Sequence, residues 1–203
     1  MILSADPRFH SAGWKLWKLE SPDAIMSRSM NPTYAYKLVD TVRQECRFAL
    51  AAFARLRSAL NEADQDWIFV CAHAVLLHSG QIARFLLPAR AASAERGEFL
   101  RRELAVPAAS PLLAPALREL LDRSDETYEE WVQNLQSPHY VELSVMPQGA
   151  LAGSSPDVFQ RRIDPDSLRF GFRHWTVDLN RLAQELRRLD NACQAWLRGH
   201  TIW

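Results

Sequence analysis

Apolar residues recur every three or four positions through the first regular stretch of the chain. The stripe consists of Leu38, Val42, Cys46, Ala49, Phe53, Leu56 and Leu60. This spacing places side chains on one face of an α-helix. The pattern therefore predicts a long amphipathic helix that follows residue 31 and buries the stripe in a core.

A second helix is predicted to start near Asp64 and to stop at Pro88. The carboxylates of Asp64 and Asp66 suit a helix N-terminus, where the helix dipole is positive. The following sequence, "WIFVCAHAVLLHSGQIARFLL", is apolar nearly all round, and proline cannot continue the helix. We expect this helix to be the most buried one in the fold.

Two further long helices are predicted after a short helix within "AASAERGEFLRREL". One starts at Ser110-Pro111, with Ser110 as its cap, and ends before Pro138. Its inward stripe is Leu113, Leu117, Leu120, Ser124, Tyr128, Trp131 and Leu135. The last helix begins near Val177. Its stripe is Leu179, Leu182, Leu186, Leu189, Cys193 and Trp196.

Residues 139–175 have the pattern of a small β element. "HYVELSVMP" alternates as a strand does, and "VFQRRIDPDSLRFGF" predicts two short strands joined by the turn "DPDS". The expected fold is therefore mainly α: an up-and-down helical bundle of four to five helices, with a small β hairpin before the last helix. Residues 1–31 are expected to form an N-terminal arm, anchored by Trp14 and Trp17, and residues 32–203 the domain.

Composition narrows the classes of function. The chain has 203 residues, with 24 basic and 24 acidic side chains, so its formal net charge is zero. A general nucleic-acid coat needs a large positive excess, and we expect no DNA partner. The three cysteines have no metal-ligand spacing, so we expect reduced, buried thiols, a cytoplasmic location, and no metal or cofactor. No apolar run reaches the length that spans a bilayer, so no membrane association is expected.

The segment "LRELLDRSDETYEEW", residues 117–131, carries a dense set of charges. Arg118 and Asp122 are four residues apart, and Arg123 lies four after Glu119 and three before Glu126. Residues at these spacings are neighbours on a helix. The simplest interpretation is a solvated face whose ion pairs each contribute only a few tenths of a kcal/mol.

Two motifs give this region a resemblance to HEPN-family proteins. In one branch of that family the second helix ends in an Asn-Ile-Ser-Lys-like motif, and a later helix carries Arg-Asn-x-x-Glu-His-x-Asp-Glu followed by Trp. "GQIARFLLP" resembles the first motif, and "LRELLDRSDETYEEW" resembles the second. The matching positions are Gln81, Arg84, Arg118, Asp122, Asp125, Glu126 and Trp131.

The resemblance covers roughly residues 34–197 and includes the hairpin "RRIDPDSLRFGF". It implies a four- or five-helix domain that usually dimerises. It further implies a site in which Arg118, Asp122, Arg123 and a histidine stand at the catalytic positions, with Gln81, Arg84, Asp125 and Glu126 around them.

The departures from the family pattern argue against inherited catalysis. Active HEPN ribonucleases use an Arg-x(4–6)-His pair, in which the arginine binds the scissile phosphate and the histidine moves a proton. Here Arg123 stands at the histidine position and Glu119 at the asparagine position. A guanidinium keeps its proton at any useful pH, so Arg123 cannot be the base. We expect a non-catalytic module that binds RNA or a partner protein as a homodimer, in a defence or toxin–antitoxin setting by family analogy.

The alternative is a metal-independent endoribonuclease that uses Arg118 with a substitute base. His73 and His78 lie five residues apart, about 140° around a helix, which is poor for joint metal binding. We expect one of them to be half-buried and the other to lie at an interface. His78 is the better candidate base because it sits beside Gln81 and Arg84. The literal motif match at Arg169 and His174 is discounted, because chance produces such short matches in an arginine-rich chain.

Overall fold

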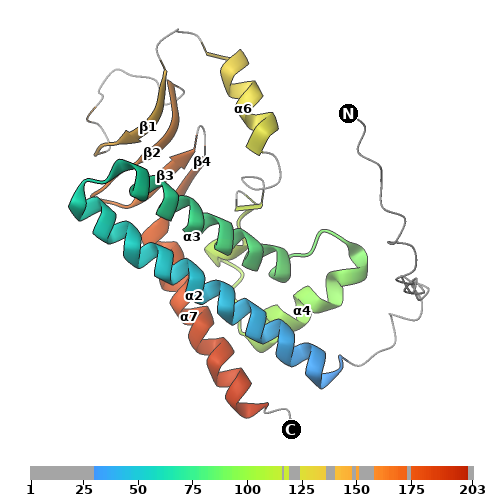
Figure 1. The fold of residues 1–203 in the computed structure, drawn as a ribbon. Coiled ribbons are helices and arrows are strands. Elements are labelled where there is room, and N and C mark those ends of the chain that lie inside the picture. The colour runs from blue at the N-terminus through green and yellow to red at the C-terminus, as the bar shows by residue number, and fades with distance from the viewer. Residues whose placement is uncertain are drawn as a thin grey trace, which may run out of the picture.

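The computed structural model describes residues 30–115, 117–118, 124–135, 140–147, 150, 158–172 and 175–200. Within these ranges, three long helices pack around one apolar core, and a four-stranded sheet covers one end of it. Figure 1 shows the sheet beside the turn that joins α2 to α3, with α4 at the opposite end of α3. The expected N-terminal arm, including Trp14 and Trp17, lies outside the described residues.

Helix α2 (Pro32–Glu62) confirms the first prediction. Asn31 caps its N-terminus, since the side chain accepts a hydrogen bond from the Thr33 amide at 2.9 Å. The helix ends where Ala63 takes a left-handed conformation with φ of 54°. Six of the seven predicted stripe residues are buried and Leu60 is partly buried, so the stripe faces the core as expected.

Helix α3 (Gln65–Leu86) starts and stops close to the predicted residues. Asp64 is its cap and accepts a hydrogen bond from the Trp67 amide at 3.1 Å. By length and composition α3 could cross a membrane, but a core helix of a soluble protein passes the same test. Only 56% of its most apolar 18-residue window is buried inside the protein. A larger share of α3 is buried than of α2 or α7, so it is the most buried of the three long helices, as expected, although Val70 and Leu77 stay exposed.

Helix α7 (Leu179–Gly199) closes the core against α2. Asp178 caps it by accepting a hydrogen bond from the Arg181 amide at 2.9 Å. Arg43 of α2 lies 3.4 Å from the Asp190 carboxylate of α7, and the Arg187 guanidinium lies 5.8 Å from the centre of the Phe53 ring. The predicted stripe of α7 is buried apart from Trp196, which is half-buried.

The sheet has the order β1-β2-β3-β4 and is mixed. Its strands are β1 (Val141–Val145), β2 (Phe159–Ile163), β3 (Arg169–Phe172) and β4 (Trp175–Asp178). Strands β1 and β2 run parallel, and the other two pairs are antiparallel. Side chains alternate along a strand, so residues at every second position share one face of the sheet. The face that carries Ile163 and Phe170 packs on the core.

The expected fold class, a helical bundle with a small hairpin, is wrong. The three predicted strands are present as β1, β2 and β3, but β4 is added and β1 pairs with β2, so they form one four-stranded sheet instead of a small hairpin. The last helix was expected to begin near Val177. Residues 175–178 instead form β4 and pair with β3, and the helix begins at Leu179, after its cap Asp178.

The predicted helix from Ser110 to Pro138 is also wrong as one element. Its N-terminus is only the short 3-10 helix η3 (Pro111–Leu113), which Ser110 caps by accepting from the Leu112 amide at 3.3 Å. Ala114 is extended, with φ −65° and ψ 129°. Pro115 explains this, because proline disfavours helical geometry in the residue before it. After the break, helical geometry resumes at Pro115, Leu117 and Arg118, and the helix α6 (Ser124–Gln133) follows further along the chain.

The short helices η2 (Ala91–Ser93) and α4 (Ala94–Glu103) return the chain to the C-terminal end of α3. Gly97 is the point of closest approach. A Cβ atom there would lie 2.7 Å from the Leu86 carbonyl oxygen and 2.6 Å from Cδ of Pro88. The Arg101 guanidinium donates to the same Leu86 carbonyl. Glycine is therefore required at position 97 by space.

Gly97→Ala is expected to lower the free energy of unfolding by about 1–3 kcal/mol, because backbone atoms rather than a movable side chain fill the space. Urea unfolding measures the change. Gly199→Ala is the matched control, since a Cβ at this helical glycine meets nothing within 4 Å. The control is expected to be neutral or to stabilise by up to about 1 kcal/mol. Equal destabilisation in both variants would contradict the close approach.

Candidate functional site

His78, the expected substitute base, faces helix α2. Its Nδ1 lies 2.8 Å from Oε2 of Glu45, and its ring centre is 5.3 Å from that of Phe48. The side chain is half-buried between the two helices. A carboxylate that accepts from Nδ1 leaves Nε2 with the lone pair, which is the arrangement of an oriented base. His78 is thus the interface histidine, held by α2.

The other expected binding residues of α3 are half-buried near its C-terminal end. These are Gln81 and Arg84. The Arg84 carbonyl accepts a hydrogen bond from Nη2 of Arg96 at 3.2 Å, and the Arg96 guanidinium lies 5.4 Å from the centre of the Phe85 ring. The arginines of this region therefore help to fix α4 against α3.

Arg118 lies shortly after η3 and is half-buried. Its Nε is buried and has no hydrogen-bond partner. The charged neighbours expected beside it, Asp122 and Arg123, lie outside the described residues, so the expected catalytic group stays a prediction. The structure establishes a half-buried arginine whose Nε has no hydrogen-bond partner among the described residues, which is an unfavourable arrangement for a buried donor.

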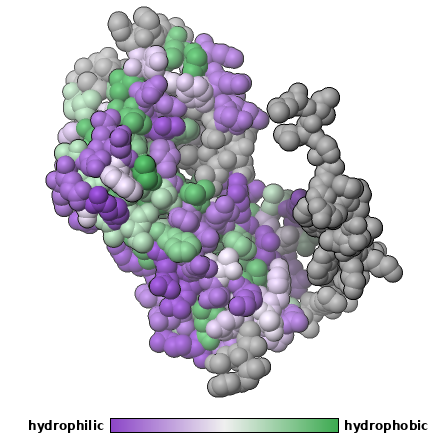
Figure 2. Space-filling model, viewed as in Figure 1, coloured by the Kyte–Doolittle hydropathy of each residue, from purple (hydrophilic) through white to green (hydrophobic). Residues whose placement is uncertain are grey.

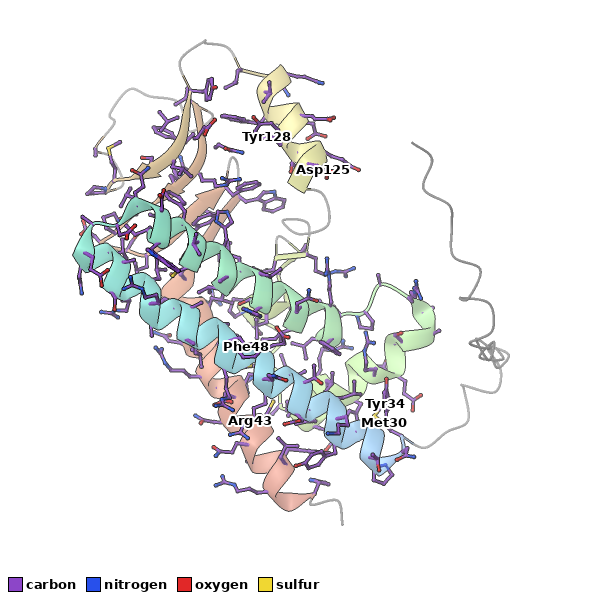
Figure 3. All side chains as sticks on the ribbon, in the orientation of Figure 1. Met30, Tyr34, Arg43, Phe48, Asp125 and Tyr128 are labelled. Carbon is purple, nitrogen blue, oxygen red and sulfur yellow. The ribbon has the colours of Figure 1, made fainter. Side chains whose placement is uncertain are left out.

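Asp125 and Glu126 occupy the first turn of α6 and are exposed. Acidic side chains at a helix N-terminus interact favourably with the dipole, which is a sufficient structural reason for both. Figure 3 shows Asp125 and Tyr128 on α6 well apart from Phe48, the residue against which His78 packs. The structure therefore does not bring Asp125 and His78 into one site.

His73, the histidine that sequence reasoning ranked second, has a more distinctive environment. Its Nδ1 lies 2.7 Å from the Phe69 carbonyl oxygen, and its ring meets Phe170 of β3 edge-on, with centres 5.4 Å apart. A carbonyl only accepts, so Nδ1 carries the proton and Nε2 keeps its lone pair. Burial lowers the pKa of His73, the hydrogen bond to Phe69 opposes this, and the charge of Arg161 lowers it further.

Arg161 stands on the face of the sheet that packs toward α3. In β2 it alternates with Phe159 and Ile163, both buried. Its guanidinium lies 6.0 Å from the centre of the Phe172 ring, and its Nε is buried without a hydrogen-bond partner. Sequence reasoning missed this residue, although the alternation in "FQRRI" already places one arginine on the apolar face.

A row of exposed and half-buried side chains runs along the outer side of α3. We call it the outer seam: Trp67, Val70, Ala74, Leu77, Gln81 and Arg84. Its spacing alternates three and four residues, as in the a and d positions of a coiled coil. Trp67, Val70 and Leu77 have relative exposures of 48%, 55% and 45%, and Phe48 of α2 adds 46%. Figure 2 shows apolar surface over α3 and the adjoining part of α2.

The cysteines do not contribute chemistry to any of these groups. Cys46, Cys71 and Cys193 are free and buried, as expected. Burial, and then the charge of Asp190, raises the pKa of Cys193 to about 12. Within the described ranges, no group of three or more His, Cys, Asp and Glu side chains could hold a metal ion.

Neither a family model, nor a curated protein, nor a solved structure matches the chain. The proposed function therefore rests on the geometry of the described residues.

The lowered pKa of His73 predicts how stability depends on pH. The folded protein favours neutral His73, whereas the unfolded chain takes up a proton with a pKa of about 6.5. This contribution to stability is complete above that value and is lost as the pH falls through it. Between about pH 7.5 and pH 5.5, the free energy of unfolding in urea should fall less in His73→Asn than in the natural protein. Parallel curves for the two proteins would contradict the assignment.

Proposed function

We propose that this chain is a HEPN-like interaction protein that acts as a homodimer and has lost ribonuclease chemistry. The observation that carries the proposal is the outer seam, because a helix that is apolar nearly all round requires cover on every side. Among the described residues of one chain, Val70 and Leu77 of this row are left exposed. Exposed apolar rows of this kind mark sites of protein interaction.

A second copy of the chain is the proposed cover, because the seam is complementary to itself. In an antiparallel copy that crosses at Ala74, Val70 of one chain lies opposite Leu77 of the other. The acidic start of α3, with Asp64 and Asp66, then lies near Arg84 of the other copy. The small side chain of Ala74 allows a close crossing, and a two-fold interface needs such self-complementarity.

The resemblance of residues 81–84 and 117–131 to HEPN motifs supports the same proposal, since HEPN domains usually dimerise. An RNA or a further protein would then bind the dimer. The basic residues of α4 do not form a large phosphate-binding surface, because Glu95, Glu98 and Glu103 alternate with them. The cytoplasmic location expected from the three thiols stays a prediction.

Size-exclusion chromatography with light scattering tests the dimer on the full chain. The natural protein is expected to be a dimer, and Val70→Asp with Leu77→Asp is expected to weaken association at least about 100-fold, because two charges enter an apolar contact. Val132→Asp is the matched control, since this valine of α6 is 44% exposed but lies away from the seam. Circular dichroism should be the same for all three proteins.

Crosslinking tests the antiparallel register itself. Ala74→Cys should give a covalent dimer under mild oxidation, because a two-fold crossing brings the two Cβ atoms to about 4 Å. The natural protein is the control, since its three thiols are buried. A monomeric natural protein at all concentrations would refute the proposal, as would a control variant that dissociates like the double variant.

The second candidate function is a metal-independent endoribonuclease that uses Arg118 with His78. The observation in its favour is the Glu45 carboxylate at His78 Nδ1, which orients the ring as a base requires. The assay is cleavage of an end-labelled RNA pool in EDTA. We expect no cleavage by the folded protein. Metal-free cleavage that both Arg118→Ala and His78→Ala abolish would establish the enzyme instead.

A further inference from the structure

The junction between α3 and the sheet holds a cation, Arg161, for which the described residues provide no counter-charge. Arg161 forms no ion pair with the described residues, and its Nε is buried without a partner. Its surroundings are the Phe172 ring and, close enough to sense its charge, His73. Desolvating a guanidinium without a partner is costly, so such an arrangement favours an external anion.

The histidine beside this cation restricts which anion fits. His73 Nδ1 is committed to the Phe69 carbonyl, so Nε2 offers a lone pair, with no hydrogen-bond partner among the described residues. A carboxylate would place its own lone pairs against Nε2. A phosphate monoester retains one proton near pH 6 and can donate it to Nε2, while its other oxygens accept from a guanidinium.

We propose that Arg161 and His73 form a binding site for a phosphate monoester or free phosphate where α3 meets the sheet. Arg161 provides the planar pair of donors that matches two phosphate oxygens. His73 accepts the remaining phosphate proton. Trp175 pairs with Phe172 across β3 and β4 and is half-buried, so it shares the core-facing side of the sheet with Arg161. This ring is placed to stack on an aromatic group that the phosphate carries.

Isothermal titration calorimetry at about pH 6 tests the site on the full chain. The probes are orthophosphate, uridine 5′-monophosphate and a dinucleoside phosphodiester. Orthophosphate and the monophosphate are expected to bind. The phosphodiester has no proton to donate to His73 and is expected to bind at least about tenfold more weakly than the monophosphate. Tighter binding of the monophosphate than of orthophosphate identifies a nucleotide, and equal binding identifies free phosphate or another monoester.

Arg161→Met is expected to reduce binding of orthophosphate at least about tenfold, since a charge-assisted pair of hydrogen bonds is lost. Arg162→Met is the matched control, because Arg162 is the next residue of β2 and points to the opposite face, over Gly171. It should change binding less than about twofold. His73→Asn keeps a donor for the Phe69 carbonyl but removes Nε2, and is expected to weaken binding of the monophosphate.

The outcomes separate this site from the proposed dimer. Binding should survive in a Val70→Ser and Leu77→Ser double variant, which removes the apolar contact without adding charge. Aspartates at these positions would repel an anion directly, because His73 lies three residues after Val70 and four before Leu77 on α3. Melting temperature controls for folding, and Arg161→Met should melt no lower than the natural protein, because it removes an unsatisfied buried charge. Absence of orthophosphate binding in the natural protein would overturn the proposal, as would equal losses in Arg161→Met and Arg162→Met.

Discussion

Helix α3 is apolar nearly all round, and the rest of the structure is arranged to cover it. Its largest shared surface is with α2, and η3, α4 and the sheet add cover on other sides. Fully buried side chains such as Val75 and Ile82 mark the covered half. The outer seam marks the remainder, with Val70 at 55% exposure. One helix therefore fixes both the core and the surface at which we propose that a second copy binds.

The sheet belongs to this core rather than to an appended hairpin. Phe170 of β3 lies 6.4 Å from the ring of Phe69, and Gln65 at the start of α3 reaches the Leu143 carbonyl of β1 at 3.4 Å. A lone hairpin is marginally stable, whereas four strands with an apolar face form a stable layer that packs against the first half of α3. The same packing that hides Phe170 places Arg161 against α3, so the fold creates the anion site as it closes the core.

Local sequence rules predicted what depends on local physics. The helices α2, α3 and α7 follow from three-and-four spacing and from caps such as Asp64, both of which act within a few residues. Strand β4 could not be predicted in this way, because its four residues are fixed by pairing with β3. The break before Pro115 could have been predicted from the sequence, since proline constrains the backbone of Ala114. The prediction gave more weight to the apolar stripe that continues past this proline.

In the candidate sites, too, local sequence predicts less than the packing between distant elements decides. Sequence proximity to Gln81 and Arg84 favoured His78, yet which helix a side chain faces is decided by packing, and His78 turns to Glu45. His73 packs against the sheet, and no local sequence pattern predicts that Arg161 lies near it. Zero net charge argues against a broad nucleic-acid surface, because that requires many cations acting together. It does not argue against a single phosphate site, where one desolvated arginine without a counter-ion acts at short range.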